Sequence, residues 1–331
     1  MEKKDYRKKN KEKKKSRSVV KILFFGTASI SKTYLEELYK NNHEIFIITV
    51  TDKPALRGQK LAPPAVKVYA LENNIKFIQP EKFTSDVIEI IKTFNADAGV
   101  VVAYGKLIPK TVFNLPKHRT FNIHFSLLPK YRGAAPAQYA LCNGETETGV
   151  TAFYIEEGLD TGNIIVQKKL DIAVKDNAET LFNKLVPLGI NVMNKTLDLF
   201  RADSVNAVAQ AGEPSFAPIF RKEAGLVNWH KSANEIYNQF RGLYLWPGIY
   251  SIVSKGKLAG KRIKFIDIEL FEKTSENKDF GVLCSIEKNK GFTVSCSIGK
   301  ILVTKVQPEN KPVMSAWAFI QGGQLSINDK F

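Results

Sequence analysis

The sequence predicts an α/β domain with a largely parallel sheet, followed by a small C-terminal β-barrel domain of OB-fold type. In about the first 200 residues, short apolar runs alternate with segments of helical spacing, which is typical of strand–helix–strand units. Beyond residue 222 the helical spacing nearly disappears, and short β-rich runs follow one another. A length of 331 residues makes two domains the default expectation.

Strands and helices are predicted to alternate along the first hundred residues. We predict strands at short apolar runs and helices where apolar residues recur three and four apart. Ser or Thr residues that can cap a helix, or a proline at its first position, precede the helical segments. In chain order we expect a strand at 19–25, a helix at 31–40, a strand at 43–51, a helix from Pro64, a strand at 75–78, a helix from Thr84 or Ser85, and a strand at 98–103.

The pattern then changes towards the C-terminus. Strands at 121–125 and 148–155 flank a helix that begins at Pro136, and an amphipathic helix over 177–200 closes the domain. One short helix follows Trp229, and strands are predicted at 248–253, 262–270, 281–286, 292–296 and 301–307. Five short strands within about 85 residues predict a small barrel, which often binds nucleic acid, although a structural β cap without a ligand gives the same pattern.

Residues 203–222 lack clear periodicity and contain two prolines and a glycine, so we expect a linker there. The predicted boundaries are therefore 1–18 for a basic disordered tail, 19–203 for the α/β domain, 204–222 for the linker and 223–331 for the barrel. No internal repeat divides the chain further.

Composition restricts the class of protein. Hydrophobic residues make up 44 % and charged residues 25 %, as in ordinary soluble globular proteins. Three cysteines without a CxxC pair favour a reducing, cytoplasmic setting and argue against a structural zinc site. The longest apolar runs are too short to span a bilayer, so we expect no membrane partner.

The net charge of +16 indicates a polyanionic partner. Residues 1–17 carry ten Lys/Arg and three Asp/Glu, a surplus of +7, which leaves +9 for the rest of the chain. A charge run like the tail is typical of a solvated, disordered segment. The composition alone does not separate RNA from DNA or from an anionic membrane.

Two polar residues lie near the end of a predicted strand, in the segment FNIHFSLLP at 121–129. Because side chains alternate along a strand, Asn122 and His124 face the same way. Pro129 turns the chain just beyond them, so the pair would form a ledge at the end of the strand. A hydrogen-bonded structural pair fits this pattern equally well.

A carboxylate follows between two glycines, in Gly158-Leu159-Asp160-Thr161-Gly162. The pattern predicts a tight loop that brings Asp160 close to another group, although a turn in which the aspartate bonds its own backbone looks the same. An Asn, His and Asp together suit acyl transfer. The amide donates to a developing oxyanion, and the aspartate stabilises an imidazolium or takes a proton through a water. An amine substrate would need no Ser or Cys nucleophile.

With 36 residues from His124 to Asp160, the Asn-x-His, Ser-Leu-Leu-Pro and Leu-Asp-Thr-Gly elements resemble the folate-dependent formyltransferases. Within that family the chain is most similar to the methionyl-tRNA formyltransferase branch. The resemblance runs from about residue 20 to the C-terminus, weakens beyond about residue 200, and does not account for the basic tail. Its further segments are Gly26-Thr27, DKPALRGQKL at 52–61, VVAYG at 101–105, SLLPKYRGAAP at 126–136 and TGVT at 148–151.

The resemblance implies a Rossmann-like domain that transfers a formyl group from N10-formyl-tetrahydrofolate, a co-substrate, to the α-amino group of methionyl-initiator tRNA, for translation initiation. It implies that Asn122, His124 and Asp160 are the catalytic residues. The implied folate site is lined by four consecutive residues with the Tyr104-Gly105 turn nearby; the four are Ser126, Leu127, Leu128 and Pro129.

The resemblance also implies that Arg57 and Lys60, in the basic loop after the second strand, approach the tRNA acceptor end. In the barrel, Lys261 and Arg262 are the candidates for contacts with the RNA backbone, on a basic strand pair that also carries Lys255, Lys257 and Lys264. Each of these cations is equally compatible with a solvated surface side chain. We expect a cytoplasmic monomer without a metal.

The Gly26-Thr27-Ala28-Ser29 turn follows the first strand, where a nicotinamide-binding loop would lie. It lacks GxGxxG, and no acidic residue closes the second strand, since Asp52 belongs to the basic loop, so we expect no nicotinamide. The nearest alternative functions keep the chemistry and change the acceptor to an amino-sugar nucleotide or to glycinamide ribonucleotide. A non-catalytic RNA-binding protein is a more distant alternative.

Overall fold

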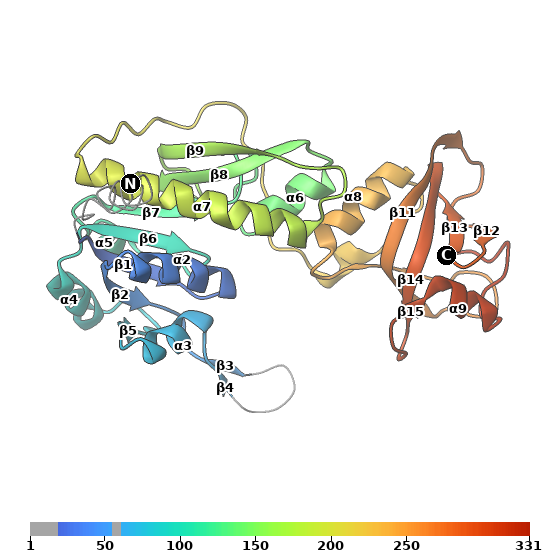
Figure 1. The fold of residues 1–331 in the computed structure, drawn as a ribbon, viewed down its shortest axis with the longest axis horizontal. Helices are drawn as coiled ribbons and strands as arrows, with labels where there is room; N and C mark the ends of the chain where they lie inside the picture. The colour runs from blue at the N-terminus through green and yellow to red at the C-terminus, as the bar shows by residue number, and fades with distance from the viewer. Residues whose placement is uncertain (1–18, 55–60) are drawn as a thin grey trace, which may run out of the picture. The chain divides into compact units, whose positions relative to one another are not determined.

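The computed structural model describes residues 19–54 and 61–331 (Figure 1). The described residues belong to two compact units. The first comprises the described residues up to His124 together with Val150–Lys168 and Val186–Gly212, and the second comprises Phe125–Gly149, Lys169–Leu185 and Glu213–Phe331. The chain therefore crosses between the units several times. The domain boundaries expected from the sequence stay a prediction.

The first unit is built on a seven-stranded sheet with the order β5-β2-β1-β6-β7-β8-β9. The first five strands in this order run parallel, and β8 runs antiparallel to β7. The central strands are continuous apolar runs because both of their faces are covered. The strands are β5 (Lys76–Ile78), β2 (Glu44–Ile48), β1 (Lys21–Gly26), β6 (Ala98–Val102), β7 (Thr120–His124), β8 (Glu147–Tyr154) and β9 (Ile164–Asp171).

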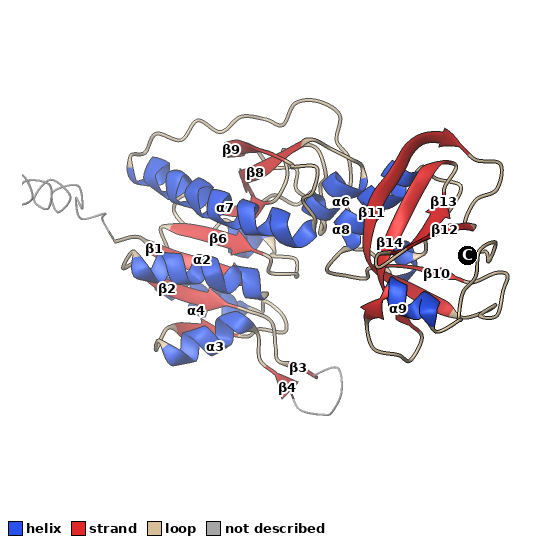
Figure 2. Cartoon of the chain, turned by 45° about the vertical axis from the view of Figure 1, so that its right-hand side comes forward, coloured by secondary structure: helices blue, strands red, loops and turns tan. Residues whose placement is uncertain are grey.

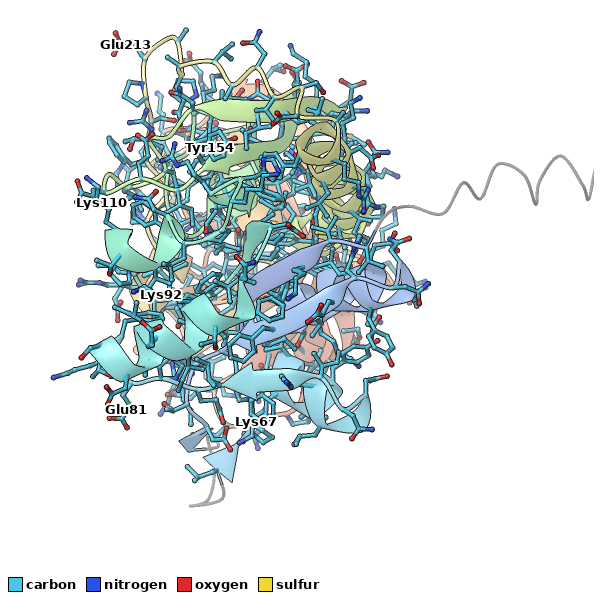
Figure 3. All side chains as sticks on the ribbon, turned by 90° about the vertical axis from the view of Figure 1, so that its left-hand side faces the viewer. Lys67, Glu81, Lys92, Lys110, Tyr154 and Glu213 are labelled. Atoms are coloured by element: carbon cyan, nitrogen blue, oxygen red, sulfur yellow. The ribbon has the colours of Figure 1, made fainter. Side chains whose placement is uncertain are left out.

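Helices cover both faces of this sheet. On one face, Leu23 and Phe25 of β1 pack with Ile91 and Val112, which belong to α4 (Ser85–Phe94) and α5 (Lys110–Phe113). Figure 3 looks from the side of these two helices. On the other face lie α2 (Ser29–Lys40) and α7 (Ala178–Arg201) (Figure 2). The hydroxyl of Tyr34 in α2 donates to the carbonyl of Val186 in α7 at 3.3 Å.

These elements confirm the predicted α/β class with its mostly parallel sheet. The sequence analysis missed β9, whose polar Gln-Lys-Lys centre is exposed and lacks the apolar run of a buried strand. It also missed the short hairpin of β3 (Lys53–Pro54) and β4 (Leu61–Ala62). The remaining helix of the unit, α3 (Ala65–Glu72), begins directly after Pro64, as predicted.

The second unit contains an antiparallel sheet with the order β10-β11-β14-β13-β12, to which β15 is added beside β14. This confirms a separate antiparallel β domain. Its core combines Trp229, Phe265, Phe292 and Phe331. The strands are β10 (Ile249–Ile252), β11 (Arg262–Glu276), β12 (Leu283–Glu287), β13 (Gly291–Ser295), β14 (Ile298–Pro308) and β15 (Met314–Ser315). The unit also contains a short 3₁₀ turn, η1 (Lys222–Gly225), and the last helix of the chain, α9 (Ala316–Gln321).

Two helices of the second unit pack closely, α6 (Pro136–Cys142) and α8 (Ala233–Leu243). A Cβ at Gly242 of α8 would collide with the sulfur of Cys142 in α6. A glycine is therefore needed where the two helix backbones approach most closely. Burial raises the pKa of the Cys142 thiol to about 12, although Lys231 and Arg241 act in the opposite direction.

A buried polar network fixes the chain before α7. The Arg241 side chain of α8 donates to the carbonyls of Asp176 at 2.6 Å and Ala173 at 3.2 Å. The carboxylate of Asp176 accepts from the Ala173 N–H at 2.8 Å, from the Thr180 hydroxyl at 3.1 Å and from the Lys184 ammonium at 2.6 Å. Because these bonds satisfy the buried aspartate, the network holds the turn at 173–177 in one conformation.

The segment predicted as a linker makes strand-like pairs in each unit. Val208 and Ile164 exchange two backbone hydrogen bonds of 2.8 and 2.9 Å in the first unit. In the second unit, the N–H of Arg132 donates to Ser215 at 2.8 Å and its carbonyl accepts from Ala217 at 2.7 Å. The low periodicity of 203–222 thus reflects single bridges that are too short to produce a sequence pattern.

Candidate active site

Strand β7 carries Asn122 and His124 at its carboxyl end. Phe121 and Ile123 face α7, since the ring of Phe121 contacts Phe200 and Ile123 lies near Gly189. Asn122 and His124 therefore point to the opposite face of the sheet. Asn122 is half-buried and His124 is buried, which keeps both side chains largely out of bulk water. The alternation predicted for this strand is confirmed.

His124 and Asp160 lie side by side. The Nδ1 atom of His124 is 3.6 Å from Oδ2 of Asp160, close enough for an ion pair when the imidazole is protonated. The two side chains are only 5 % and 14 % exposed, so their interaction is less screened than at the surface. The imidazole also makes an edge-to-face contact with the ring of Phe153 on β8, with the ring centres 6.1 Å apart. The structure thus brings together a base and a carboxylate that are 36 residues apart in the sequence.

The loop between β8 and β9 presents Asp160. The residue adopts a left-handed backbone conformation with φ of +52°, which aspartate tolerates better than most residues. The N–H of Tyr154 donates to the Asn163 carbonyl at 3.0 Å and closes the base of the loop. A Cβ at Gly162 would collide with the carbonyl of Tyr154, so this glycine allows the close approach of two backbone segments. The prediction of a tight glycine-dependent loop is confirmed.

Tyr104 and Gly105 follow β6, the strand beside β7. Tyr104 is buried, and burial raises the pKa of its hydroxyl to about 12. Within the described part of the chain, no group accepts from or donates to that hydroxyl. Gly105 has φ of +79° and open space around its α-carbon. An unpartnered buried hydroxyl beside an uncrowded glycine is suited to receive a polar ligand.

The other residues of the predicted folate site belong to the second unit. Ser126 is buried and donates to the Lys130 carbonyl at 2.6 Å. Leu128 and Pro129 are buried and joined by a cis peptide bond, while Leu127 is half-buried. The hydrogen bond from Ser126 and that from the Lys130 N–H to the Leu127 carbonyl close a tight turn directly after β7, where the sequence predicted that Pro129 turns the chain.

Several comparisons with known proteins bear on this site. Residues 20–197 match the formyl transferase family model, and residues 220–324 match the model of the formyl transferase C-terminal domain. The chain belongs to the formyltransferase family. Among curated members, a methionyl-tRNA formyltransferase from Endomicrobium trichonymphae is 70 % identical over 94 % of this chain and 100 % of the relative. One from Thermodesulfovibrio yellowstonii is 40 % identical over 92 % of this chain and 96 % of the relative.

A solved formyltransferase has the same fold. The crystal structure of an N-formyltransferase from Helicobacter canadensis, in complex with folinic acid and dTDP-3-aminofucose, has a TM-score of 0.62 and is 23 % identical. The similarity covers 88 % of this chain and 100 % of that one. The comparison supports the fold, and the family predicted from the Asn-x-His, Ser-Leu-Leu-Pro and Leu-Asp-Thr-Gly elements is confirmed.

Of the four cations assigned to RNA contacts, two lie outside the described residues and two lie at the start of β11. Arg57 and Lys60 lie outside the described residues. Lys261 and Arg262 are exposed at the start of β11, and the Arg262 guanidinium lies 5.7 Å from the ring centre of Tyr250 on β10. Exposure fits both a phosphate contact and the solvated surface side chain that the sequence left open.

Within residues 19–54 and 61–331, no group of three or more His, Cys, Asp or Glu side chains is arranged to hold a metal ion. No helix in the same residues combines the length and apolar character required to cross a membrane.

Sequence reasoning missed one residue that contacts the candidate site. The Gln210 side-chain amide, on the predicted linker, donates to the carbonyl of Asp160 at 2.7 Å and to that of Gly162 at 2.9 Å. The only sequence pattern nearby is an Ala-Gln-Ala-Gly segment without periodicity, which does not indicate a distant partner.

Proposed function

We propose that this chain transfers the formyl group of N10-formyl-tetrahydrofolate to the α-amino group of methionyl-initiator tRNA, for translation initiation. The observation that carries the choice of acceptor is the 70 % identity to a methionyl-tRNA formyltransferase along the whole of that relative. The observation that supports the chemistry is the His124–Asp160 pair beside Asn122 at the end of β7.

The folate co-substrate supplies an activated formyl carbon that an amine can attack. Tyr104 and Gly105 fit such a ligand, because one has a buried hydroxyl without a described partner and the other leaves open space. We assign Ser126, Leu127, Leu128 and Pro129 to the same site from the resemblance, and the buried tight turn they form supports this assignment.

Asn122 and His124 stabilise the negative charge that develops on the formyl oxygen. The side-chain amide of Asn122 and the protonated imidazole of His124 are donors on the same face of β7, and preorganised donors of this kind supply the largest electrostatic contribution in many acyl-transfer sites. Their burial strengthens each interaction, because little water competes for the same atoms.

Asp160 assists the proton transfer that accompanies the reaction. The attacking amine must lose a proton, and the leaving nitrogen must gain one. Asp160 lies 3.6 Å from His124, so it stabilises the imidazolium and provides, with His124 or one water, the route for this transfer. No nucleophilic side chain is required, since the substrate amine attacks directly.

The acceptor is a polyanion, and the chain outside residues 1–17 carries a surplus of +9. We assign backbone contacts to the exposed Lys261 and Arg262 of the C-terminal β domain. Arg57 and Lys60, in the basic loop, are assigned to the acceptor end from the resemblance alone. We further propose a cytoplasmic monomer, in keeping with the three free cysteines.

The test incubates the purified protein with N10-formyl-tetrahydrofolate and methionyl-initiator tRNA and measures formylation of the methionine. The variant His124→Ala runs in parallel. We expect formylation by the wild type and a loss of about 10³-fold in turnover for the variant. The variant must show an unchanged melting temperature, so that a folding defect is separated from a catalytic one.

The outcomes separate the alternatives. Formyl transfer to an amino-sugar nucleotide or to glycinamide ribonucleotide, with none to tRNA, would contradict the acceptor assignment and retain the chemistry. Absence of transfer to all three amines, with tRNA still bound, would favour the non-catalytic RNA-binding alternative.

A further inference from the structure

Gln210 contacts the Asp160 loop from a different part of the chain. Its side-chain Nε2 donates to the Asp160 carbonyl at 2.7 Å and to the Gly162 carbonyl at 2.9 Å. Both lengths are those of well-formed hydrogen bonds. The amide therefore bridges the carbonyls of the two residues on either side of Thr161, one of which is Asp160 itself.

The segment that carries Gln210 is itself fixed. Two residues before it, Val208 exchanges backbone hydrogen bonds of 2.8 and 2.9 Å with Ile164 at the start of β9. Gln210 is half-buried although its neighbours Ala209 and Ala211 are exposed, so its side chain turns inwards from an exposed strand-like segment. The backbone that carries the Gln210 amide is therefore held in place independently of the bonds from this amide to the loop.

The loop depends on such a contact. Residues 156–159 are exposed, and Asp160 adopts a left-handed φ of +52°, which aspartate tolerates and which a bond to its own carbonyl helps to hold. At Gly162 the backbone already lies against the Tyr154 carbonyl, so the loop has one close contact at its base and needs another near Asp160.

We propose that Gln210 is a positioning residue for catalysis: by bonding the carbonyls of Asp160 and Gly162, it holds the Asp160 carboxylate in register with His124. This inference rests on the proposed role of Asp160 in proton transfer. In this role Gln210 acts through the loop, as a donor to its main-chain carbonyls. A displacement of about 1 Å in a catalytic group lowers turnover by up to about 10²-fold.

The test measures formylation kinetics for Gln210→Ala and Gln210→Glu. The first variant removes both hydrogen bonds. The second keeps the length of the side chain but places an acceptor oxygen against two carbonyl oxygens, so it repels the loop. A matched control is Gln239→Ala, because Gln239 in α8 also donates to two backbone carbonyls, those of Ala224 at 2.7 Å and Leu226 at 3.2 Å, and lies outside the candidate site.

We expect Gln210→Ala to lower kcat by about 10- to 100-fold and to leave the KM values for tRNA and folate within about twofold. Gln210→Glu should lose at least as much. Gln239→Ala should keep the wild-type kcat, whatever it does to the melting temperature. A structural role alone would lower the melting temperature without this split between kcat and KM.

The double variant Gln210→Ala/Asp160→Asn gives the decisive readout. If Gln210 acts only through Asp160, the double variant is no slower than Asp160→Asn alone. If the fold-losses in kcat of the two single variants multiply in the double variant, the inference is wrong. It is also wrong if Gln210→Ala keeps a kcat within twofold of the wild type. If Asp160→Asn itself retains wild-type turnover, the catalytic role of Asp160 fails and the inference fails with it. A strong loss in Asp160→Asn without one in Gln210→Ala removes only the inference.

Discussion

Two aspartates in loops of this chain, Asp160 and Asp176, have similar burial and different surroundings. Their side chains are 14 % and 7 % exposed. The Asp176 carboxylate accepts from a backbone N–H, a hydroxyl and an ammonium within 3.1 Å. The Asp160 carboxylate faces His124 at 3.6 Å, and the bonds from Gln210 fall on the main chain of its loop.

The comparison shows that burial alone does not distinguish a structural aspartate from one that takes part in the chemistry. A carboxylate that is held by short bonds to its own turn stabilises the fold, because moving a proton onto or off it would break those bonds. A carboxylate that lies beside an imidazole, in a loop whose main-chain carbonyls accept bonds from Gln210, is placed to exchange a proton with that imidazole. The variants of Asp160 and Asp176 test this separation between a chemical and a structural aspartate directly, and the other variants compare the site with the surface.

The largest effect is expected for Asp160→Asn. The amide keeps the size of the side chain and removes the proton acceptor, so kcat should fall by about 10³-fold while the melting temperature changes little. Single-turnover formylation separates this chemical loss from product release. A variant with near wild-type kcat would show that Asp160, like Asp176, has a structural role only.

Asn122→Ala removes the proposed amide donor beside His124. Loss of one such donor should lower kcat by about 10²-fold, with smaller changes in KM, because the amide acts mainly on charge that appears in the transition state. Steady-state formylation measures the effect. Asn73→Ala is the control, since that amide only bonds the Tyr69 carbonyl at the end of α3, and its kcat should match the wild type.

Asp176→Asn should destabilise the protein by about 2 kcal/mol at pH 7 and leave the kcat of the folded enzyme unchanged. Burial would raise the pKa of Asp176, but the bonds from Lys184, Ala173 and Thr180 outweigh it and hold the pKa below its usual value. The stabilisation is therefore complete above about pH 4–5, the range of the unfolded aspartate, and is lost as the pH falls through the lower folded-state pKa.

Urea unfolding of Asp176→Asn and the wild type from pH 7 to pH 3 measures this dependence. The difference in unfolding free energy should shrink at acid pH. Glu89→Gln serves as the comparison, because its pair with Lys92 is exposed and contributes at most about 0.5 kcal/mol. A difference that stays constant down to pH 3 would contradict the structural role assigned to the ionised Asp176.

The smallest effects are expected at the exposed cations. Lys261→Ala and Arg262→Ala should each weaken tRNA binding by about threefold and reduce the salt dependence of binding by about one counterion. Filter binding at several salt concentrations measures both. Lys92→Ala, on exposed α4, should change neither quantity. A loss in kcat without a change in affinity would place these cations with the catalytic group instead.

The sequence predicted the parts of the fold and site that depend on local patterns. Alternation along β7 placed Asn122 and His124 on one face, and the glycines around Asp160 predicted its tight loop. Strand β9 was missed because its apolar residues at 164–166 form only a short run and its Gln-Lys-Lys centre is exposed, so neither a long apolar run nor a period of two marks it. Elements with a clear local sequence pattern were therefore predicted, and elements without one were not.

The Gln210 contact could not be predicted for a different reason. It joins residues 48 and 50 apart through a side chain and two carbonyl groups, and carbonyl groups are the same at every position of the sequence. The opposite roles of Asp160 and Asp176 also depend on partners brought in by the fold. The sequence shows which residue types are available for a site, and tertiary contacts determine which of these residues take part in it.

The packing of Gly242 against Cys142 makes this thiol a natural probe of one helix pair. Because burial raises its pKa to about 12, the half-buried Cys142 thiol is almost entirely protonated at pH 8. Its sulfur also lies against the α8 backbone at Gly242. Alkylation of Cys142 is therefore slow while α6 and α8 stay packed and faster when they separate, so its rate responds to changes in the packing of this helix pair.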